Sequence, residues 1–273
     1  MTTPDPALTD AEGGANQQFW HDYLANYHRA QAVARPVFSR IPSDPRCQLC
    51  GSPFHGVGGR LMRVIGKAQS VANPRTCNQC EKVMIQHHGG AEVPGTMLFA
   101  DIRGSTALAE GATPAAFHDL LNRFYTAASA VVFAHNGFVD KFVGDEVVAV
   151  FAPVLGVDHA RRAVDAGLDL LRATGHADPD GPWVPVGAGV HTGTVWFGAV
   201  GEGDYVELTV VGDPVNTTAR LAALAGSGEL LVSTAAATEA GLEPDRARRS
   251  LELKGKGEPL DVVALRVDGA PPA

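Results

Sequence analysis

The sequence predicts an α+β protein in which helices cover a mixed β-sheet, with a small cysteine-bearing region in front of it. From residue 96 onward, strand-like apolar runs alternate with helical patterns in the order β-α-β-β-α-β. Two of these runs, 138–143 and 146–151, flank the dipeptide Gly-Asp, which is a hairpin signal. Four cysteines lie ahead of the sheet pattern in two Cys-x-x-Cys pairs. The element order matches the split β-α-β plan, also called ferredoxin-like.

Each element of the sheet region has its own local signal. The first strand is the buried run 96–102, and the first helix begins with Thr113 as N-cap and Pro114 at its first position. Gly137 suits the end of that helix, and the hairpin follows it. The remaining expected elements are a helix at 158–175, strands at 184–201 and 204–212, a helix at 213–226, a strand at 228–234 and a final hairpin at 251–267.

The bulk composition excludes several classes of partner. The 273 residues suffice for one sizeable core with a small attachment. A net charge of −8 repels the negative charge of nucleic acid and of anionic lipid. Neither nucleic acid nor a membrane is therefore an expected partner. The sequence shows no secretion signal, and its longest apolar stretch is too short to span a bilayer, so we expect a cytoplasmic protein.

The N-terminal region divides into a tail and a helix. Residues 1–16 are polar and without periodicity, which predicts a disordered tail, and residues 268–273 form a short tail at the other end. Residues 17–36 predict an amphipathic helix that ends at Pro36. Its apolar stripe consists of Phe19, Trp20, Tyr23, Leu24 and Tyr27. That face either packs on its own domain or forms a dimer.

The cysteine pairs predict a metal-binding knuckle, with a linker, over residues 41–91. The ligands are Cys47, Cys50, Cys77 and Cys80. In a cytosolic chain this spacing indicates metal binding sooner than disulfides, with structural Zn²⁺ as the first interpretation. An iron–sulfur cluster and a dithiol switch remain alternatives. The histidines nearby, His55, His87 and His88, are expected at the surface. We expect the knuckle to position or regulate the domain that follows.

Two aspartates are candidate metal ligands. Asp101 lies at the end of the first strand and Asp145 lies in the hairpin turn, and these elements are neighbours in the predicted sheet. Taken singly, a strand-end aspartate is usually a turn former, but two fixed carboxylates suit a pair of Mg²⁺ or Mn²⁺ ions. The turn after the first strand offers backbone N–H groups for phosphate oxygens, from Arg103, Gly104, Ser105 and Thr106.

Four segments together resemble the catalytic domain of the class III nucleotide cyclases, in that family's order. They read FADIRGST, KFVGDEVVAVF, GAGVHTGTVWFGAVG and TVVGDPVNTTARL, and the resemblance covers about residues 92–267. It implies that Asp101 and Asp145 bind two metal ions, with the carbonyl of Ile102 completing a metal shell. It also implies that Lys141 and Thr209 read the base of the nucleotide.

The resemblance assigns the chemistry itself to the helix at 213–226. It implies that Asn216 orients the ribose and that Arg220 stabilises the pentavalent α-phosphate. These residues are i and i+4 on one helix face, and a guanidinium suits phosphate oxygens. Taken alone, both residues are typical of the solvent-exposed surface of a helix. In this family each site lies between two chains, which implies a homodimer with an inactive monomer.

The expected reaction is conversion of ATP to 3′,5′-cyclic AMP and pyrophosphate. Lys141 favours adenine, since guanylate members typically carry Glu there, whereas Thr209 stands where many members have Asp. The alternatives are a cyclase for GTP or a pyrimidine nucleotide, and a non-catalytic nucleotide-binding regulator. Two departures from the family pattern are Ser105, where an aromatic residue is common, and the lack of a lysine at 258–263.

Overall fold

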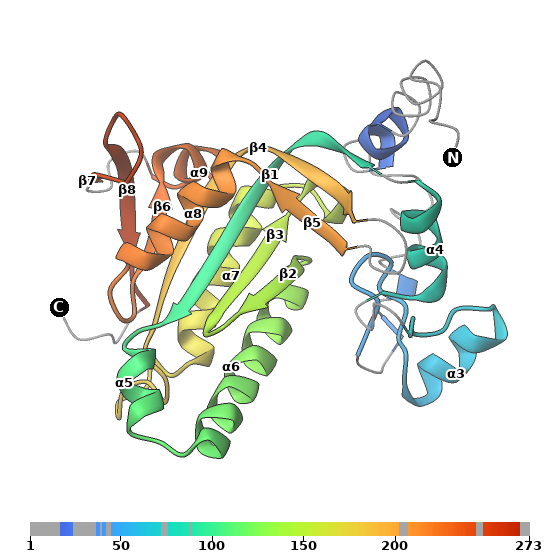
Figure 1. The fold of residues 1–273 in the computed structure, drawn as a ribbon, viewed down its shortest axis with the longest axis horizontal. Coiled ribbons are helices and arrows are strands. Elements are labelled where there is room, and N and C mark those ends of the chain that lie inside the picture. Colours follow the sequence, from blue (N-terminus) through green and yellow to red (C-terminus); the bar gives the residue numbers. More distant parts are fainter. Residues whose placement is uncertain are drawn as a thin grey trace, which may run out of the picture. The chain divides into compact units, whose positions relative to one another are not determined.

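The computed structural model describes residues 17–23, 37–38, 40–41, 45–71, 76–87, 89–201, 207–243 and 248–267 (Figure 1). Both predicted tails, together with Leu24, Tyr27, Pro36 and His88, lie outside the described residues. The chain forms two compact units. The first comprises residues 1–93, 153–157 and 196–211, and the second comprises 94–152, 158–195 and 212–273. None of the helices described is long and apolar enough to cross a membrane.

A mixed sheet runs through the second unit. Its strands are β1 (Gly89–Ile102), β2 (Phe138–Val143), β3 (Glu146–Phe151), β4 (Val186–Val200), β6 (Leu230–Ser233), β7 (Arg248–Leu251) and β8 (Leu260–Leu265). Their order is β2-β3-β1-β4-β6-β8-β7 (Figure 1). Another strand, β5 (Glu207–Val211), pairs with the last residues of β4 within the first unit.

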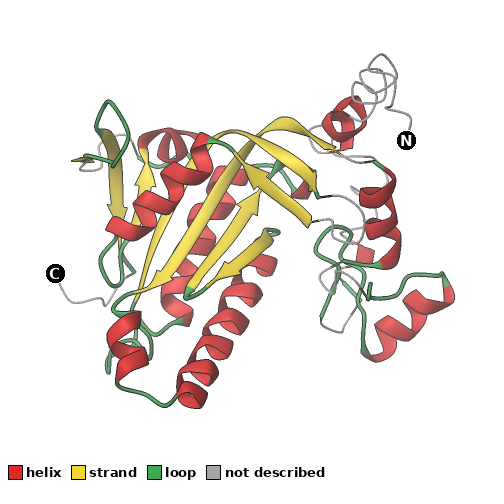
Figure 2. Cartoon of the chain, viewed as in Figure 1, coloured by secondary structure: helices red, strands yellow, loops and turns green. Residues whose placement is uncertain are grey.

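Helices lie on both faces of this sheet (Figure 2). They are α5 (Ser105–Glu110), α6 (Pro114–Ala134), α7 (His159–Ala173), α8 (Asp213–Leu224) and α9 (Thr234–Glu239). Helices α6, α7 and α9 bury their apolar stripes against Leu98, Ala149 and their neighbours on one face. On the other face, Leu221 and Ala225 at the end of α8 pack against Leu231 and Val262.

The predicted α+β fold is confirmed, and most elements begin where their local signals place them. The side chain of Thr113 accepts a hydrogen bond from the backbone N of Ala116 at 3.2 Å, so it caps α6 as expected. The hairpin turns at Gly144, whose φ of +61° is the left-handed conformation that glycine adopts without strain. The short helices α5 and α9 had not been anticipated.

The linker expected in the last part of residues 41–91 is helix and strand instead. The helix α4 (Asn78–Gln86) occupies its first part, and β1 already begins at Gly89. Glycines and Pro94 are typical of a loop, but Ala91 and Val93 are buried whereas Glu92 and Pro94, which alternate with them, are exposed. That alternation is typical of a strand.

The first unit holds the cysteine region and its helices, α3 (Gly56–Val64) and α4; a 3₁₀ turn (Pro153–Leu155) also belongs to it. Residues 17–23 are helical, and Trp20 is fully buried. The indole Nε1 of Trp20 donates to the backbone O of His87 at 2.6 Å, and the ring of Phe19 stacks on that of His87. These contacts favour packing within its own unit, over dimerisation, for this part of the predicted helix.

We expect Gly189→Ala to disturb the packing of α8 against β4 and to lower the stability of the fold. A Cβ at Gly189 would lie 2.5 Å from the backbone N of Ala222 and 2.7 Å from Cβ of Leu221, so the helix would have to shift. Overpacking of this kind lowers the free energy of unfolding by about 1–3 kcal/mol, which thermal or urea unfolding measures. Gly257→Ala is the control, since a Cβ there meets nothing within 4 Å. Equal stability of the two variants would contradict the prediction.

Candidate functional site

The two candidate metal ligands are brought together by strand pairing. β1 and β3 are antiparallel, and Asp101 at the end of β1 stands opposite Glu146 at the start of β3. Asp145 directly precedes that residue, and the backbone N of Ile102 lies 3.4 Å from the backbone O of Asp145. The carboxylates of Asp101 and Asp145 therefore share one corner of the sheet, as the sequence predicts.

Burial and like charge perturb all three carboxyl groups at this corner. Burial, then the contact with Asp145, raises the pKa of Asp101 to about 6. Burial, then the charges of Asp101 and Asp145, raises the pKa of Glu146 to about 7. For Asp145, burial works upward, but hydrogen bonds from Ser105 and Asp101 leave its pKa below the usual value. The corner thus concentrates negative charge that a divalent cation would stabilise, and its oxygen donors are those that Mg²⁺ and Mn²⁺ prefer.

Arg103 is the cation that faces this corner. Its guanidinium forms an ion pair with Asp101 and also donates to the backbone O of Ala223 at 3.0 Å, at the end of α8. Its backbone N donates to the O of Pro185 at 2.8 Å. That N–H is therefore engaged within the fold, while the guanidinium links the carboxylate to α8.

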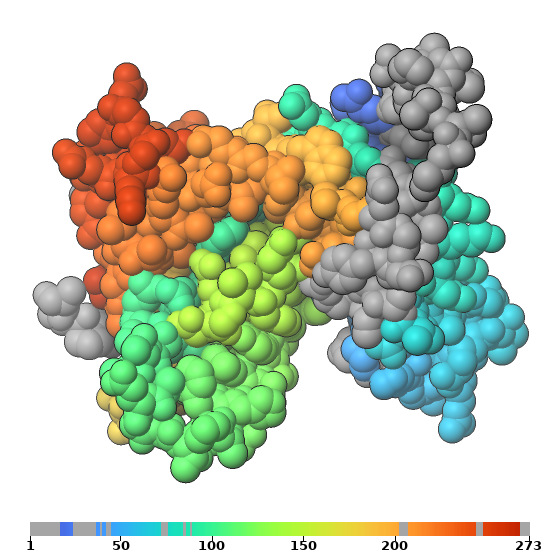
Figure 3. Space-filling model, in the orientation of Figure 1, coloured from blue at the N-terminus to red at the C-terminus, as the bar shows by residue number. Residues whose placement is uncertain are grey.

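A pocket of about 500 Å³ adjoins the carboxylates. Its walls come from α5, α6 and the hairpin turn, and they consist of Ser105, Thr106, Ala109, Glu110, Phe117, Leu121, Gly144 and Asp145. Gly104, at φ +70°, turns the chain sharply from β1 into α5. The α5–α6 segment is green in Figure 3 and lies at the surface of the molecule. The predicted phosphate turn and Asp145 thus meet at one open pocket.

Tyr125 supports the hairpin turn and was missed by the sequence reasoning. Its hydroxyl donates to the backbone O of Gly144, and its ring stacks on Phe142 with ring centroids 4.2 Å apart. Burial, then the charge of Asp145, raises the pKa of Tyr125. A second aromatic residue beside the core stripe of α6, facing an aromatic at the end of β2, is the signal that could have indicated this contact.

The other predicted site residues do not line this pocket. Lys141 is on β2, with its Nζ 3.4 Å from Oδ2 of Asp140. Asn216 and Arg220 lie one turn apart on α8, and Nη1 of Arg220 is buried without a hydrogen-bond partner in the described part of the chain. Thr209 is buried on β5, opposite Gly198 of β4. The pocket therefore brings Asp145 together with Ser105 and Thr106 of the predicted phosphate turn, and its lining does not include Lys141, Asn216 or Arg220.

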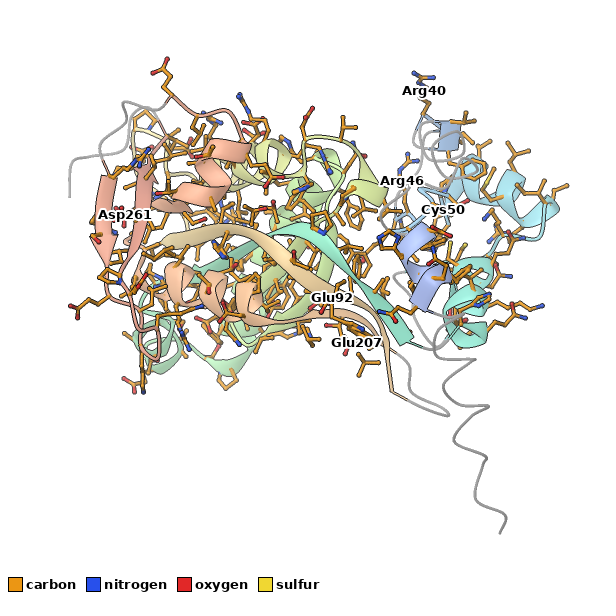
Figure 4. The ribbon with its side chains drawn as sticks, turned by 90° about the horizontal axis from the view of Figure 1, so that it is seen from above. Arg40, Arg46, Cys50, Glu92, Glu207 and Asp261 are labelled. Atoms are coloured by element: carbon orange, nitrogen blue, oxygen red, sulfur yellow. The ribbon has the colours of Figure 1, made fainter. Side chains whose placement is uncertain are left out.

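The four cysteines form a buried cage in the first unit. Their sulfur atoms all lie within 4.8 Å of one another, and the Sγ atoms of Cys50 and Cys77 are 3.8 Å apart. The backbone N of Cys77 donates to Sγ of Cys47 at 3.3 Å. The guanidinium of Arg46 holds the preceding chain through the O of Phe38 and the O of Ile41 (Figure 4).

Charge within the cage is unevenly shared. Hydrogen bonds from Cys47, Cys77 and Cys80 lower the pKa of Cys50, and the bond from Cys47 lowers the pKa of Cys77 to about 7. Burial raises the pKa of Cys47. Lys67 lies beside the cage, with Nζ 3.7 Å from Sγ of Cys50 and 3.9 Å from Sγ of Cys77. Thiolates crowded in this way are the ligand set of a tetrahedral metal site.

Comparison with known families decides the identity of the larger part of the chain. The family described as the adenylate and guanylate cyclase catalytic domain matches residues 91–263, more than half of the chain. The chain belongs to this family. The cyclase catalytic domain thus includes the corner with Asp101 and Asp145 and the whole of α8.

Solved structures agree with this assignment, and the chain also matches curated relatives. The uncharacterized proteins Rv1318c and Rv1319c of Mycobacterium tuberculosis are 37% and 36% identical over 183 and 177 residues, which is 63% of this chain. The match spans only 32% of the length of each. The crystal structure of the guanylyl cyclase Cya2 is 29% identical with a TM-score of 0.59, covering 65% of this chain and 93% of that one. The adenylyl cyclase CyaB from P. aeruginosa is 27% identical with a TM-score of 0.56, covering 65% and 95%.

We expect Tyr125→Phe to weaken metal binding at the carboxylates of the cyclase domain. The variant keeps the ring stacked on Phe142 but loses the hydrogen bond to Gly144, which is worth about 1 kcal/mol and fixes the turn that carries Asp145. Calorimetric titration with Mn²⁺ should show lower affinity. Thr126→Val is the matched control, since its hydroxyl bonds only to Asn122 of the same helix. An unchanged Mn²⁺ affinity in Tyr125→Phe would contradict the role.

Proposed function

We propose that this chain is an adenylate cyclase that converts ATP to 3′,5′-cyclic AMP and pyrophosphate. The observation that carries the proposal is the pairing of Asp101 and Asp145 beside the pocket of Ser105 and Thr106, within a chain of the cyclase family. Carboxylate oxygens that can hold divalent cations, beside an open pocket, are what a nucleoside triphosphate with its metal ions requires. A decayed, purely regulatory member would have no need to maintain this costly charge cluster.

Asp101, Asp145 and the carbonyl of Ile102 would hold two Mg²⁺ or Mn²⁺ ions. When bound, these ions lower the barrier to attack of the 3′-hydroxyl on the α-phosphorus by offsetting the charge that develops there. Arg220 would donate hydrogen bonds to the α-phosphate oxygens, and its buried Nη1 has no partner in the described part of the chain. Asn216, one helical turn earlier, would hold the ribose in the orientation for attack.

Lys141 supports ATP as the substrate. Its ammonium can donate to the N1 acceptor of adenine, whereas guanine carries a hydrogen-bond donor at that atom. Thr209 would contact the exocyclic amine with its hydroxyl. The similar solved structures include a guanylyl cyclase as well as an adenylyl cyclase, so conversion of GTP is the second candidate activity.

A homodimer would complete each site. Lys141, Asn216 and Arg220 do not line the pocket that Asp145 shares with the phosphate turn of the same chain. We propose that they complete the site of a second copy, so that one two-fold dimer holds two sites.

The cysteine cage is proposed to hold one structural Zn²⁺. Four sulfurs at about 2.3 Å from one tetrahedral ion lie about 3.8 Å from one another. The Cys50–Cys77 separation is 3.8 Å and every separation is within 4.8 Å, which suits a single ion. An iron–sulfur cluster would place its own iron and sulfide atoms between the thiolates and hold them farther apart.

The decisive assay offers ATP, GTP, CTP and UTP to the purified chain with Mn²⁺. We expect cyclic AMP as the main product, and we expect Asp101→Asn to lower kcat/KM by about 100-fold or more because it removes a metal ligand. Asp119→Asn, an exposed carboxylate on α6, is the matched control and should leave activity unchanged. No cyclic product from any nucleotide would refute the enzyme proposal, and cyclic GMP as the main product would favour the second candidate.

Metal analysis of the purified chain tests the cysteine cage. We expect about one zinc per chain, no visible absorption from iron–sulfur charge transfer, and loss of the zinc in a Cys47→Ser, Cys50→Ser double variant. His55→Ala is the control because this nearby histidine lies outside the cage. Stoichiometric iron with sulfide would show that the cage holds a cluster instead.

A further inference from the structure

A β-bulge lies immediately before Lys141. Along the β2–β3 ladder, Val139 is paired with Ala149 and Lys141 with Val148, so Asp140 is an extra residue between two consecutive pairs. Residues directly opposite each other in an antiparallel pair share a face of the sheet. Ala149 and Val148 are adjacent and point to opposite faces, and therefore so do Val139 and Lys141, although they are two residues apart.

The bulge decides which face receives Lys141. Val139 and Ala149 belong to the core that packs against α6 and α7. Phe142, the next residue after Lys141, stacks on Tyr125 of α6, which confirms that the residues on either side of Lys141 in the ladder face these helices. In a regular strand Lys141 would follow Val139 into that core. The extra residue places it instead on the opposite face.

That opposite face is the one that carries the carboxylates. Asp101 is opposite Glu146, and Phe99 is opposite Val148, which is also the partner of Lys141. Lys141 and Asp101 thus share a sheet face because of the bulge. Bulges near functional sites commonly re-aim a side chain in this way.

Asp140 also contacts the side chain that it re-aims. Its carboxylate is 2% exposed and its Oδ2 lies 3.4 Å from Nζ of Lys141, whose side chain is 38% exposed. A buried carboxylate beside a half-exposed ammonium restricts the rotamers of the lysine. The pair therefore presents a charged donor from a defined direction.

We propose that Asp140 is a positioning residue for nucleotide selection, and that it sets the base preference of the cyclase by fixing the direction of Lys141. The inference rests on the proposed function, in which Lys141 reads the base. Asp140 itself would not touch the nucleotide. It would act by the geometry of the bulge and by its ion pair with Lys141.

The experiment compares ATP with GTP in four chains: the wild type, Asp140→Asn, Lys141→Ala, and the double variant. We expect the wild type to prefer ATP in kcat/KM and Asp140→Asn to lower the ATP-to-GTP ratio about tenfold, chiefly through a higher KM for ATP. In the Lys141→Ala background, Asp140→Asn should change the ratio no further, since both changes remove one interaction. Asp119→Asn is again the matched control.

A purely structural role for Asp140 predicts a different pattern. Asp140→Asn would then lower the unfolding temperature and reduce turnover of both nucleotides equally, leaving the ratio unchanged, and this result would overturn the proposal. So would an Asp140→Asn effect on the ratio that persists undiminished beside Lys141→Ala, or a wild type without preference.

A binding measurement separates this proposal from the proposed activity. If the wild type makes no cyclic product, the activity fails, but the affinities for 3′-deoxy-ATP and 3′-deoxy-GTP still report base selection, because these probes lack only the attacking hydroxyl. The same loss of preference in Asp140→Asn is then expected in the ratio of dissociation constants. An equal ratio in the wild type and Asp140→Asn would overturn the positioning role.

Discussion

The candidate site depends on one register, the antiparallel pairing of β1 with β3. Leu98, Ala100 and Ile102 of β1 point into the core with α6 and α7, and a slip of one residue would turn all three to the opposite face of the sheet, away from these helices. Their burial fixes the register, and the register in turn sets Asp101 opposite Glu146 and beside Asp145. The hydrophobic core therefore forces together charges that would otherwise repel one another.

Holding these carboxylates together costs free energy, which other contacts of the fold offset. Asp101 and Glu146 have raised pKa values because each is partly buried next to negative neighbours. Arg103 offsets part of that charge and also binds the end of α8, while Tyr125 holds the turn at Gly144. Carboxylates that are held together in this way lower the stability of the fold but suit the binding of cations.

Sequence reasoning succeeded where the signal is local. The cap at Thr113, the hairpin turn at Gly144 and the two cysteine pairs each depend on a few adjacent residues, and the family motifs lie in the same short segments. Strand register is not local. The bulge at Asp140 becomes visible only when β2 is paired with β3, and the role of Tyr125 only when α6 lies on the hairpin.

The sequence predicts the first strand from residue 96, whereas β1 begins at Gly89, and the reason is related. Glycines at 89, 90 and 95 favour a loop by propensity, but a Cβ at Gly90 would lie 2.5 Å from the backbone O of Phe197, so glycine there serves a close approach between strands. Thr209 lies on β5, which pairs with β4. The sequence indicates two strands here, but it does not give the register that sets Thr209 opposite Gly198. Which residues of α8 serve which chain is likewise a property of the assembly, and no single-chain pattern encodes it.

Mixing two inactive chains tests the central claim of a site shared between copies. An Asp101→Ala chain lacks a proposed metal ligand and an Arg220→Ala chain lacks the guanidinium proposed to bind the α-phosphate, so neither homodimer should make cyclic AMP. Their heterodimer would contain one site with both residues intact, and activity should return on mixing, rising with concentration as the copies exchange. If the mixture remains inactive while size analysis shows that heterodimers form, the site does not lie between two chains.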